Sequence, residues 1–439
     1  MNRKISVNLA LAIAIIAMTV TFSVTVIMSQ NMFDKTVSSV REKELEYKKL
    51  AEIDKTVRAE CYYPIDNNVL FDMLGAGFMA GISDQNAKYY TAKQYLEYLN
   101  EQAGKSIGIG TDFVKEVGSY PRVIRVYGSS PAADLGIANG FTLRQIDGTD
   151  LKNLTVAQID VLLRGEDGTT LNLLYADQSG NALPAVEVQR RQYETPSIET
   201  RMNENEVIGY IKILTFNGQT AGELQRALDT MRAAPQGFQG LILDVRNNTG
   251  GTLKYALDAL DMICPAGPMG YQQGKEGEPV VLGISDEAQK LSVPMAVLVN
   301  AGTASGAELF AGAVREFGLG QLVGINTAGK GSVQCVPIRL SDGSAISYTV
   351  GTLLTGKGTP FDGAGFAPDV EAVLKADEEK NFYDLTVDTD SQITKAKEVV
   401  AGSIVRQMPD DTPPAASTAV NSADTTSAVT ADASSVPAA

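Results

Sequence analysis

The chain has 439 residues, of which 44% are hydrophobic, and this length suits about two or three domains. Its 37 lysines and arginines against 52 aspartates and glutamates give 37 − 52 = −15, a poor match for the phosphates of a nucleic acid. There is no histidine, which excludes Ser–His and Cys–His nucleophile pairs and histidine-ligated zinc. The three cysteines, Cys61, Cys264 and Cys335, are too far apart in sequence to predict a zinc site, an iron–sulfur site or a disulfide scaffold.

Residues 5–28 form a run of 24 residues without a charge, directly after Arg3 and Lys4. As a helix this run would be about 36 Å long, enough to cross a hydrocarbon core of about 30 Å. The positive flank predicts a cytoplasmic N-terminus and an exported remainder, so residues 1–31 are interpreted as a signal anchor. A cleaved signal peptide, with secretion of the rest, is the alternative.

Residues 32–103 are predicted to be a helical N-terminal region. Short β-like runs then predict a small domain over 104–192. The expected elements up to that point are helices over 33–58, 69–81, 91–100, 130–136 and 156–163, and strands over 122–127, 142–146, 171–175 and 185–189.

From residue 193 strands and helices alternate, which predicts an α/β layered domain over 193–406. Its expected strands are 207–213, 240–245, 295–299 and 322–325, and its expected helices are 220–231, 253–263 and 304–317. Residues 407–439 consist mainly of Ala, Ser, Thr, Pro and Asp and are expected to be a disordered tail.

Ser305 lies in Thr303-Ala304-Ser305-Gly306-Ala307-Glu308, where a predicted strand gives way to a helix. The free N–H groups and the positive dipole end of a helix N-terminus suit an oxyanion. The alternative is that Ser305-x-x-Glu308 is only a helix capping box.

Lys330 lies between two glycines in Ala328-Gly329-Lys330-Gly331-Ser332-Val333-Gln334. Without histidine, a buried lysine can serve as the base, with Gln334 holding its amine. A solvated loop lysine is the alternative. Gly324-x-x-x-x-Gly329-Lys330 also approaches a phosphate-binding loop, but Gly331 stands where that motif needs Ser or Thr, and a β-like run follows.

A third segment, Asp244-Val245-Arg246-Asn247-Asn248-Thr249-Gly250-Gly251, follows an apolar strand and precedes a helix. Its two glycines allow backbone N–H groups to approach a ligand closely. A tight turn of purely structural value is the alternative.

Together the three segments resemble the C-terminal processing peptidases, also called tail-specific proteases. Residues 244–251 match that family's D-x-R-x-N-x-G-G loop, 303–308 its nucleophile turn, and 329–334 its G-K-G-x-V-Q loop, with Lys330 25 residues after Ser305. Residues 104–191 resemble the family's PDZ domain. Residues 365–370 resemble its closing G-x-x-P-D-V.

The resemblance implies an α/β fold, with a crotonase/ClpP-like layered protease domain preceded by an α+β PDZ domain, the helical lead-in and the N-terminal transmembrane helix. It implies that Ser305 attacks the scissile carbonyl, that Lys330 takes its proton and that Gln334 orients Lys330. The oxyanion would be bound by the backbone N–H of Gly306 and by that of either Gly250 or Gly251. No cofactor and no metal are expected.

The PDZ resemblance implies that a peptide C-terminus adds to a sheet edge. Its carboxylate would be held by backbone amides of Ser106, Ile107, Gly108, Ile109 and Gly110. Arg164 matches a position that couples peptide binding to proteolysis in the family, and an exposed turn arginine is the alternative.

The expected protein is therefore a membrane-anchored, extracytoplasmic serine endopeptidase. Its expected partners are proteins or peptides with exposed C-termini and a membrane reached through residues 5–28, but not nucleic acid. The helical region 32–103 is a candidate homodimer surface. Two alternatives stay open, a catalytically silent PDZ receptor for peptide tails and a crotonase-type acyl-CoA enzyme.

Overall fold

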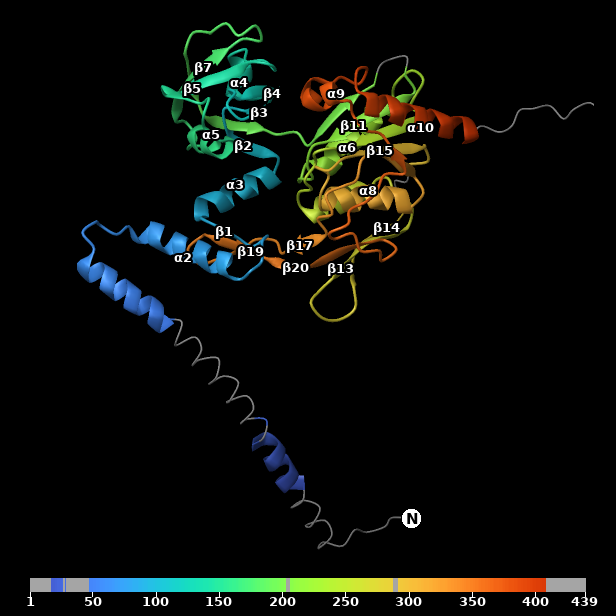
Figure 1. The fold of residues 1–439 in the computed structure, drawn as a ribbon. Coiled ribbons are helices and arrows are strands. Elements are labelled where there is room, and N and C mark those ends of the chain that lie inside the picture. The colour runs from blue at the N-terminus through green and yellow to red at the C-terminus, as the bar shows by residue number, and fades with distance from the viewer. Residues whose placement is uncertain (1–16, 27, 29–46, 203–205, 287–290, 408–439) are drawn as a thin grey trace, which may run out of the picture. The chain divides into compact units, whose positions relative to one another are not determined.

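The computed structural model describes residues 17–26, 28, 47–202, 206–286 and 291–407, which belong to two compact units, 1–81 and 82–439 (Figure 1). In the first unit, residues 17–26 and 47–60 are helical, and α2 covers Asn67–Gly81. Of the predicted membrane segment, residues 5–16 and 27 lie outside the described residues, as does the predicted tail from 408 onward. Within the described ranges, no helix has both the length and the apolar character needed to cross a membrane.

The second unit begins with a strand inside the region that the sequence predicts to be helical. This strand, β1 (Lys88–Tyr90), pairs antiparallel with β19 (Ala345–Ser347). Helix α3 (Ala92–Gln102) follows, and it begins as predicted, because Thr91 Oγ1 accepts the N–H of Gln94 at 3.2 Å. The partner of β1 is remote in the sequence, so local residue patterns carry little sign of the strand.

The small domain predicted over 104–192 is built on an antiparallel sheet in the order β3-β4-β5-β7-β8, with β6 paired to β5. Its elements are β2 (Lys105–Gly108), β3 (Thr111–Val114), β4 (Arg122–Val126), α4 (Pro131–Asp134), β5 (Thr142–Ile146), β6 (Thr149–Asp150), α5 (Val156–Leu163), β7 (Thr170–Ala176) and β8 (Val186–Gln189). These elements enclose a core of their own, which includes Leu143, Ile159 and Leu173. Strand β2 lies outside the sheet and pairs with β9 (Arg191–Glu194).

The rest of the second unit is centred on a six-stranded sheet in the order β10-β11-β12-β15-β16-β21, which is parallel except at β10. In chain order its elements are β10 (Ile198–Arg201), β11 (Ile208–Ile213), α6 (Thr220–Arg232), β12 (Gly240–Asp244), α7 (Leu253–Asp261), β15 (Met295–Val299), α8 (Gly306–Glu316), β16 (Gly320–Gly324) and β21 (Val370–Glu371). The predicted α/β alternation is confirmed.

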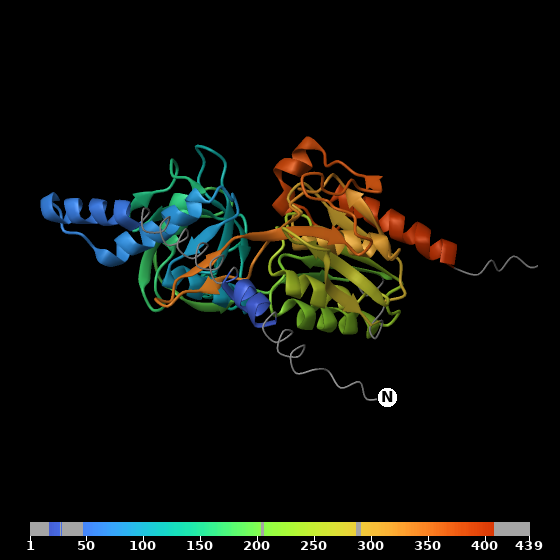
Figure 2. The same ribbon diagram turned by 90° about the horizontal axis from the view of Figure 1, so that it is seen from below.

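Helices cover both faces of this sheet, because its central strands are apolar on both sides. Leu243 and Val297 pack into one core with α6, α7 and α8. Ile242 and Leu298 face the other way, toward α10 (Ser391–Gln407). Figures 1 and 2 show α10, in red, on the side of the sheet opposite the green and yellow helices.

Two smaller antiparallel sheets complete the unit, in the orders β14-β13-β20-β17 and β1-β19-β18. Their remaining strands are β13 (Gly267–Gln273), β14 (Val280–Ser285), β17 (Ser332–Gln334), β18 (Ile338–Arg339) and β20 (Thr349–Thr355). Helix α9 (Ala376–Lys380) and the 3₁₀ helix η1 (Phe382–Asp384) precede α10.

Strands β12, β15 and β16 are parallel neighbours, so the loops that follow them share one edge of the central sheet. In open α/β sheets this carboxyl edge is where ligands bind. The three predicted catalytic segments are the loops after these three strands.

Candidate active site

Ser305 lies directly before α8 in a backbone conformation that few residues adopt. Its φ is 57° and its ψ is −119°, a conformation that costs on the order of 1–3 kcal/mol for a residue with a side chain. Its hydroxyl makes no capping hydrogen bond to α8, and the residue lines a pocket of about 1080 Å³. The hydroxyl is therefore available to a ligand in that pocket.

Hydrogen bonds hold the three predicted segments against one another. The N–H of Ala304 donates to the carbonyl of Asn248 at 3.0 Å, and the N–H of Ala328 donates to the carbonyl of Thr303 at 3.0 Å. The Thr303 hydroxyl donates to the carbonyl of Val245 at 2.9 Å. These bonds fix the turn that carries Ser305 between the other two loops.

The carboxylate of Glu308 joins the serine turn to the lysine loop. Its Oε2 accepts the N–H groups of Ser305 at 2.9 Å and Lys330 at 2.8 Å. Its Oε1 accepts the Thr327 hydroxyl at 2.6 Å and the N–H of Gly329 at 2.7 Å. Glu308 is fully buried, so these four donors replace all of its hydration.

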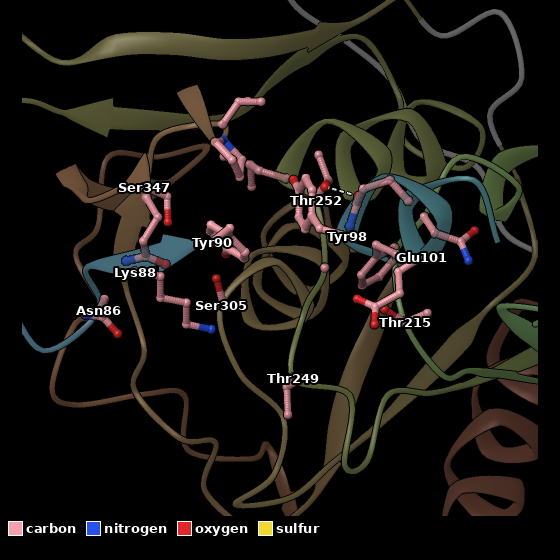
Figure 3. Close-up of a pocket in the computed structure, with 18 of the residues that line it drawn as sticks. Asn86, Lys88, Tyr90, Tyr98, Glu101, Thr215, Thr249, Thr252, Ser305 and Ser347 are labelled. Carbon is pink, nitrogen blue, oxygen red and sulfur yellow. Dashed lines mark hydrogen bonds between the residues drawn. The ribbon is translucent and has the colours of Figure 1, made fainter. Parts of the chain in front are cut away.

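Ser305, Lys330, Gln334 and Gly251 line the same pocket, whose surroundings are drawn in Figure 3 with Ser305 labelled. Ser305 and Gln334 are half-buried, whereas Lys330 is exposed, contrary to the burial that the sequence argument asks of a lysine base. In the described part of the chain, no hydrogen bond joins Ser305 to Lys330. The amide Nε2 of Gln334 donates to the Ser332 hydroxyl at 3.2 Å and the Thr349 hydroxyl at 3.4 Å.

The two glycines of the first loop differ in what their N–H groups do. The N–H of Gly250 donates to Asn248 Oδ1 at 2.8 Å. Among the described residues, no hydrogen bond is found for the N–H of Gly251 or for that of Gly306. Gly251 has a φ of 127°, and a Cβ there would lie 2.2 Å from the carbonyl oxygen of Phe216, so only glycine fits.

A buried ion pair anchors the first loop. The side chain of Arg246 contacts Asp244 Oδ2 at 2.6 Å and Asp390 Oδ2 at 2.9 Å, and the exposure of all three side chains is 3% or less. Burial raises the pKa of Asp244, but the charge and hydrogen bonds of Arg246 outweigh burial and leave that pKa below its ordinary value. Asp390 lies next to α10, so the pair ties this helix to the loop of Gly251.

The residues predicted to hold a peptide C-terminus lie around a second pocket of about 780 Å³. It is lined by Ser106, Ile107, Gly108, Ile109, Gly110 and Arg164, together with parts of β3, α5 and α3. Arg164 also lines the Ser305 pocket, and it contacts Glu97 of α3 at 3.9 Å with a side chain that is 62% exposed.

Two residues of this region were missed or undervalued by the sequence interpretation. Glu308 was visible only as a helix cap, since nothing in the local pattern points to its bonds with the lysine loop. Asp390 carried no signal, because its partner Arg246 lies far away in the sequence. Within the described ranges, no group of three Cys, Asp or Glu residues could hold a metal ion.

Comparison with known proteins covers about three quarters of the chain. The model of "Peptidase family S41" matches residues 207–372. The carboxy-terminal processing protease CtpA of Bacillus subtilis (strain 168) is 30% identical over 329 residues, which cover 75% of this chain and 69% of that protein. A CtpA-like serine protease of Staphylococcus epidermidis is 29% identical over 332 residues, which cover 75% of this chain and 66% of that protein.

The chain thus spans about two thirds of the length of these two curated relatives. A solved structure described as an S41 protease from Bacteroides fragilis NCTC 9343 has a TM-score of 0.50 and 16% identity. It covers 78% of this chain and 93% of its own, and at this identity the likeness concerns the fold alone.

Proposed function

The chain belongs to peptidase family S41, a family of serine-type peptidases, and we propose that it cleaves polypeptides near their C-termini with Ser305 as nucleophile and Lys330 as base. One observation carries this proposal. Ser305 is held at the N-terminus of α8 with a φ of 57° and an uncommitted hydroxyl, in the pocket that Lys330 also lines.

In the proposed reaction, Ser305 Oγ attacks the carbonyl carbon of the scissile bond while its proton passes to the neutral amine of Lys330. The leaving amine then takes that proton, and an acyl group remains on Ser305 until water removes it. Lys330 is exposed without substrate, so a peptide in the pocket is expected to exclude water from it. Gln334 would orient the amine by accepting a hydrogen bond from one of its N–H groups.

The oxyanion is expected to bind the N–H groups of Gly306 and Gly251. Gly251 is preferred to Gly250 because the N–H of Gly250 already donates to Asn248. A Cβ on Gly250 would lie 3.1 Å from the nitrogen of Gly306, so the two loops adjoin at this point. Each oxyanion donor typically lowers the barrier by about 3 kcal/mol.

Tail recognition is assigned to a PDZ-type domain over residues 104–192. A peptide C-terminus would pair along β3, an edge strand of its sheet, opposite α5. In the described residues, the N–H groups of Ile109 and Gly110 have no hydrogen-bond partner, which suits a carboxylate. Gly110 has a φ of 80°, and a Cβ there would lie 2.0 Å from that of Ser130.

The place of action is a further part of the proposal. The uncharged run over 5–28 after Arg3 and Lys4 supports an anchor in the cell membrane with the peptidase outside the cytoplasm. Protease added to intact cells should then digest the second unit. Protection of that unit until the cells are lysed would contradict this placement.

The function is tested with Ser305→Ala. This variant should lose peptide cleavage while it keeps its thermal unfolding temperature and its binding of peptide tails. Cleavage by the variant at the wild-type rate would refute the proposal. A wild-type chain that binds tails without cleaving any would instead favour the silent receptor, and turnover of an acyl-CoA would favour the crotonase alternative.

A further inference from the structure

The orientation of the Gln334 amide decides whether this residue can hold Lys330. The proposed role needs Oε1 to accept a hydrogen bond from the amine, because a lysine amine or ammonium offers mainly donors. A flipped amide would present its own N–H to the amine instead. A glutamine has no intrinsic preference between these orientations, so its neighbours must select one.

The neighbour that selects the orientation is Thr349, the cross-strand partner of Gln334 between β17 and β20. The Thr349 hydroxyl has one proton, and it donates that proton to Asp84 Oδ1 at 2.9 Å. Toward Gln334 the hydroxyl can therefore only accept, which it does from Nε2 at 3.4 Å. Hence Nε2 must face Thr349, and Oε1 is left for Lys330.

Asp84 sets the donor-to-acceptor direction of these hydrogen bonds, since a carboxylate accepts hydrogen bonds and cannot donate them. Asp84 also accepts the N–H of Thr349 at 2.6 Å and that of Asn86 at 2.9 Å. The first of these bonds is the main reason why the pKa of Asp84 lies below its ordinary value. At neutral pH the group is thus fixed as an acceptor.

A second contact from the same segment fits this orientation but does not select it, because the Ser332 hydroxyl keeps a proton that it could donate. Asn86 Nδ2 donates to Ser332 Oγ at 3.3 Å, and Ser332 Oγ in turn accepts Gln334 Nε2 at 3.2 Å. Both Asp84 and Asn86 immediately precede β1, whose pairing with β19 fixes this segment beside the lysine loop.

We propose that Asp84 is a positioning residue, which acts through Thr349 to fix the Gln334 amide with its oxygen toward Lys330. The segment before β1 would then complete the active site, although it lies far from the three catalytic segments in the sequence. The inference rests on the proposed function, because it gives Gln334 a task only if Lys330 is the base.

The test removes the Thr349 hydroxyl without changing the shape of the side chain. With an internally quenched peptide that has a free apolar C-terminus, Thr349→Val should lower kcat about fivefold to tenfold, the usual worth of one hydrogen bond. KM should change less than about twofold, and Thr349→Ser should recover most of the loss. Asp84→Asn should lower kcat in the same way, since an amide can donate to the Thr349 hydroxyl and reverse the chain of bonds.

A double-mutant cycle distinguishes an effect on the position of Gln334 from general damage to the protein. In a Gln334→Ala background, Thr349→Val and Asp84→Asn should cause no further loss of kcat. Asp342→Asn is the matched control, since Asp342 likewise accepts a backbone N–H and a hydroxyl, both of Ser344, but has no bond to the Gln334 network. It should keep the wild-type kcat.

Any of three results would overturn the inference. The first is a wild-type kcat in Thr349→Val, and the second is an equal loss of kcat with and without Gln334. The third is the same loss of kcat in Asp342→Asn. Thermal unfolding of every variant identifies those that fail to fold, and either Thr349→Val or Asp84→Asn suffices for the cycle. If Ser305→Ala is inactive while Thr349→Val is normal, only this inference fails. If Ser305→Ala cleaves normally, the proposed function fails first.

Discussion

Glu308→Gln is the sharpest test of how the active site is held together. The carboxylate accepts four hydrogen bonds, two on each oxygen, from Ser305, Thr327, Gly329 and Lys330. Glutamine keeps the shape of the side chain and one acceptor oxygen. Its NH₂ group must then face the two donors that belonged to the other oxygen.

The loss of unfolding free energy is smallest when that NH₂ group takes the position of Oε1. There the Thr327 hydroxyl can rotate and accept, but the N–H of Gly329 loses its partner. One buried donor without a partner costs about 1–3 kcal/mol. With the NH₂ group at the Oε2 position, the N–H groups of both Ser305 and Lys330 would lose their acceptor. The loss of unfolding free energy is therefore at least about 1–3 kcal/mol. For a domain of this size that corresponds to a fall in Tm of about 2–12 °C.

The assay pairs thermal unfolding with peptide cleavage. Glu308→Gln should lower Tm by this amount and should also reduce kcat, because Ser305 and Lys330 lose the group that fixes their backbones. Glu316→Gln, on the same helix, removes an acceptor from the exposed turn at Lys357 and serves as the control. A Glu308→Gln protein with unchanged Tm and unchanged kcat would refute the reasoning.

Three further predictions concern the ion pair and the reaction. Arg246→Met should lower the free energy of unfolding by about 3–5 kcal/mol, because it leaves two buried carboxylates unpaired. The control Arg232→Met breaks an exposed ion pair and should lower that free energy by less than about 1 kcal/mol. Equal losses for the two variants in urea titrations would contradict this. Because the folded pKa of Asp244 is lowered, its stabilising contribution is complete above the ordinary value of 3.8 and is lost as pH falls through the lowered pKa. The unfolding free energy of the wild-type protein should therefore fall in that acid range, and a flat acid limb would count against this reasoning. EDTA should leave the rate of cleavage unchanged, because the proposed reaction of Ser305 and Lys330 uses no metal ion; inhibition by EDTA would oppose that mechanism.

The sequence predicted best what is local and periodic. Strand β15 and helix α5 have the predicted bounds, because an uninterrupted apolar run and a Thr155 cap mark them without help from distant residues. Helix α8 begins at Gly306 rather than at 304, since Ser305 takes a positive φ that no helical residue has.

What depends on distant partners could not be predicted. Strand β1 exists through its pairing with β19, and β17 and β18 divide one β-like run between two sheets. The same holds at the site, where motif spacing singled out Ser305, Lys330 and Gln334, but the bonds of Asp84 to Thr349 join residues with no common pattern. Motifs thus indicated the groups proposed to react, whereas the contacts that orient them needed the structure.

The central claim is that Ser305 carries the acyl group during cleavage, and intact-mass measurement tests it most directly. A peptide ester with a good leaving group makes acylation fast, so acid quenching during turnover should trap the acyl-enzyme. The account predicts one adduct with the mass of the acyl group, mapped by proteolytic peptides to Ser305 and absent from Ser305→Ala and Lys330→Ala. An adduct on another residue, or ester turnover by Ser305→Ala at the wild-type rate, would contradict it.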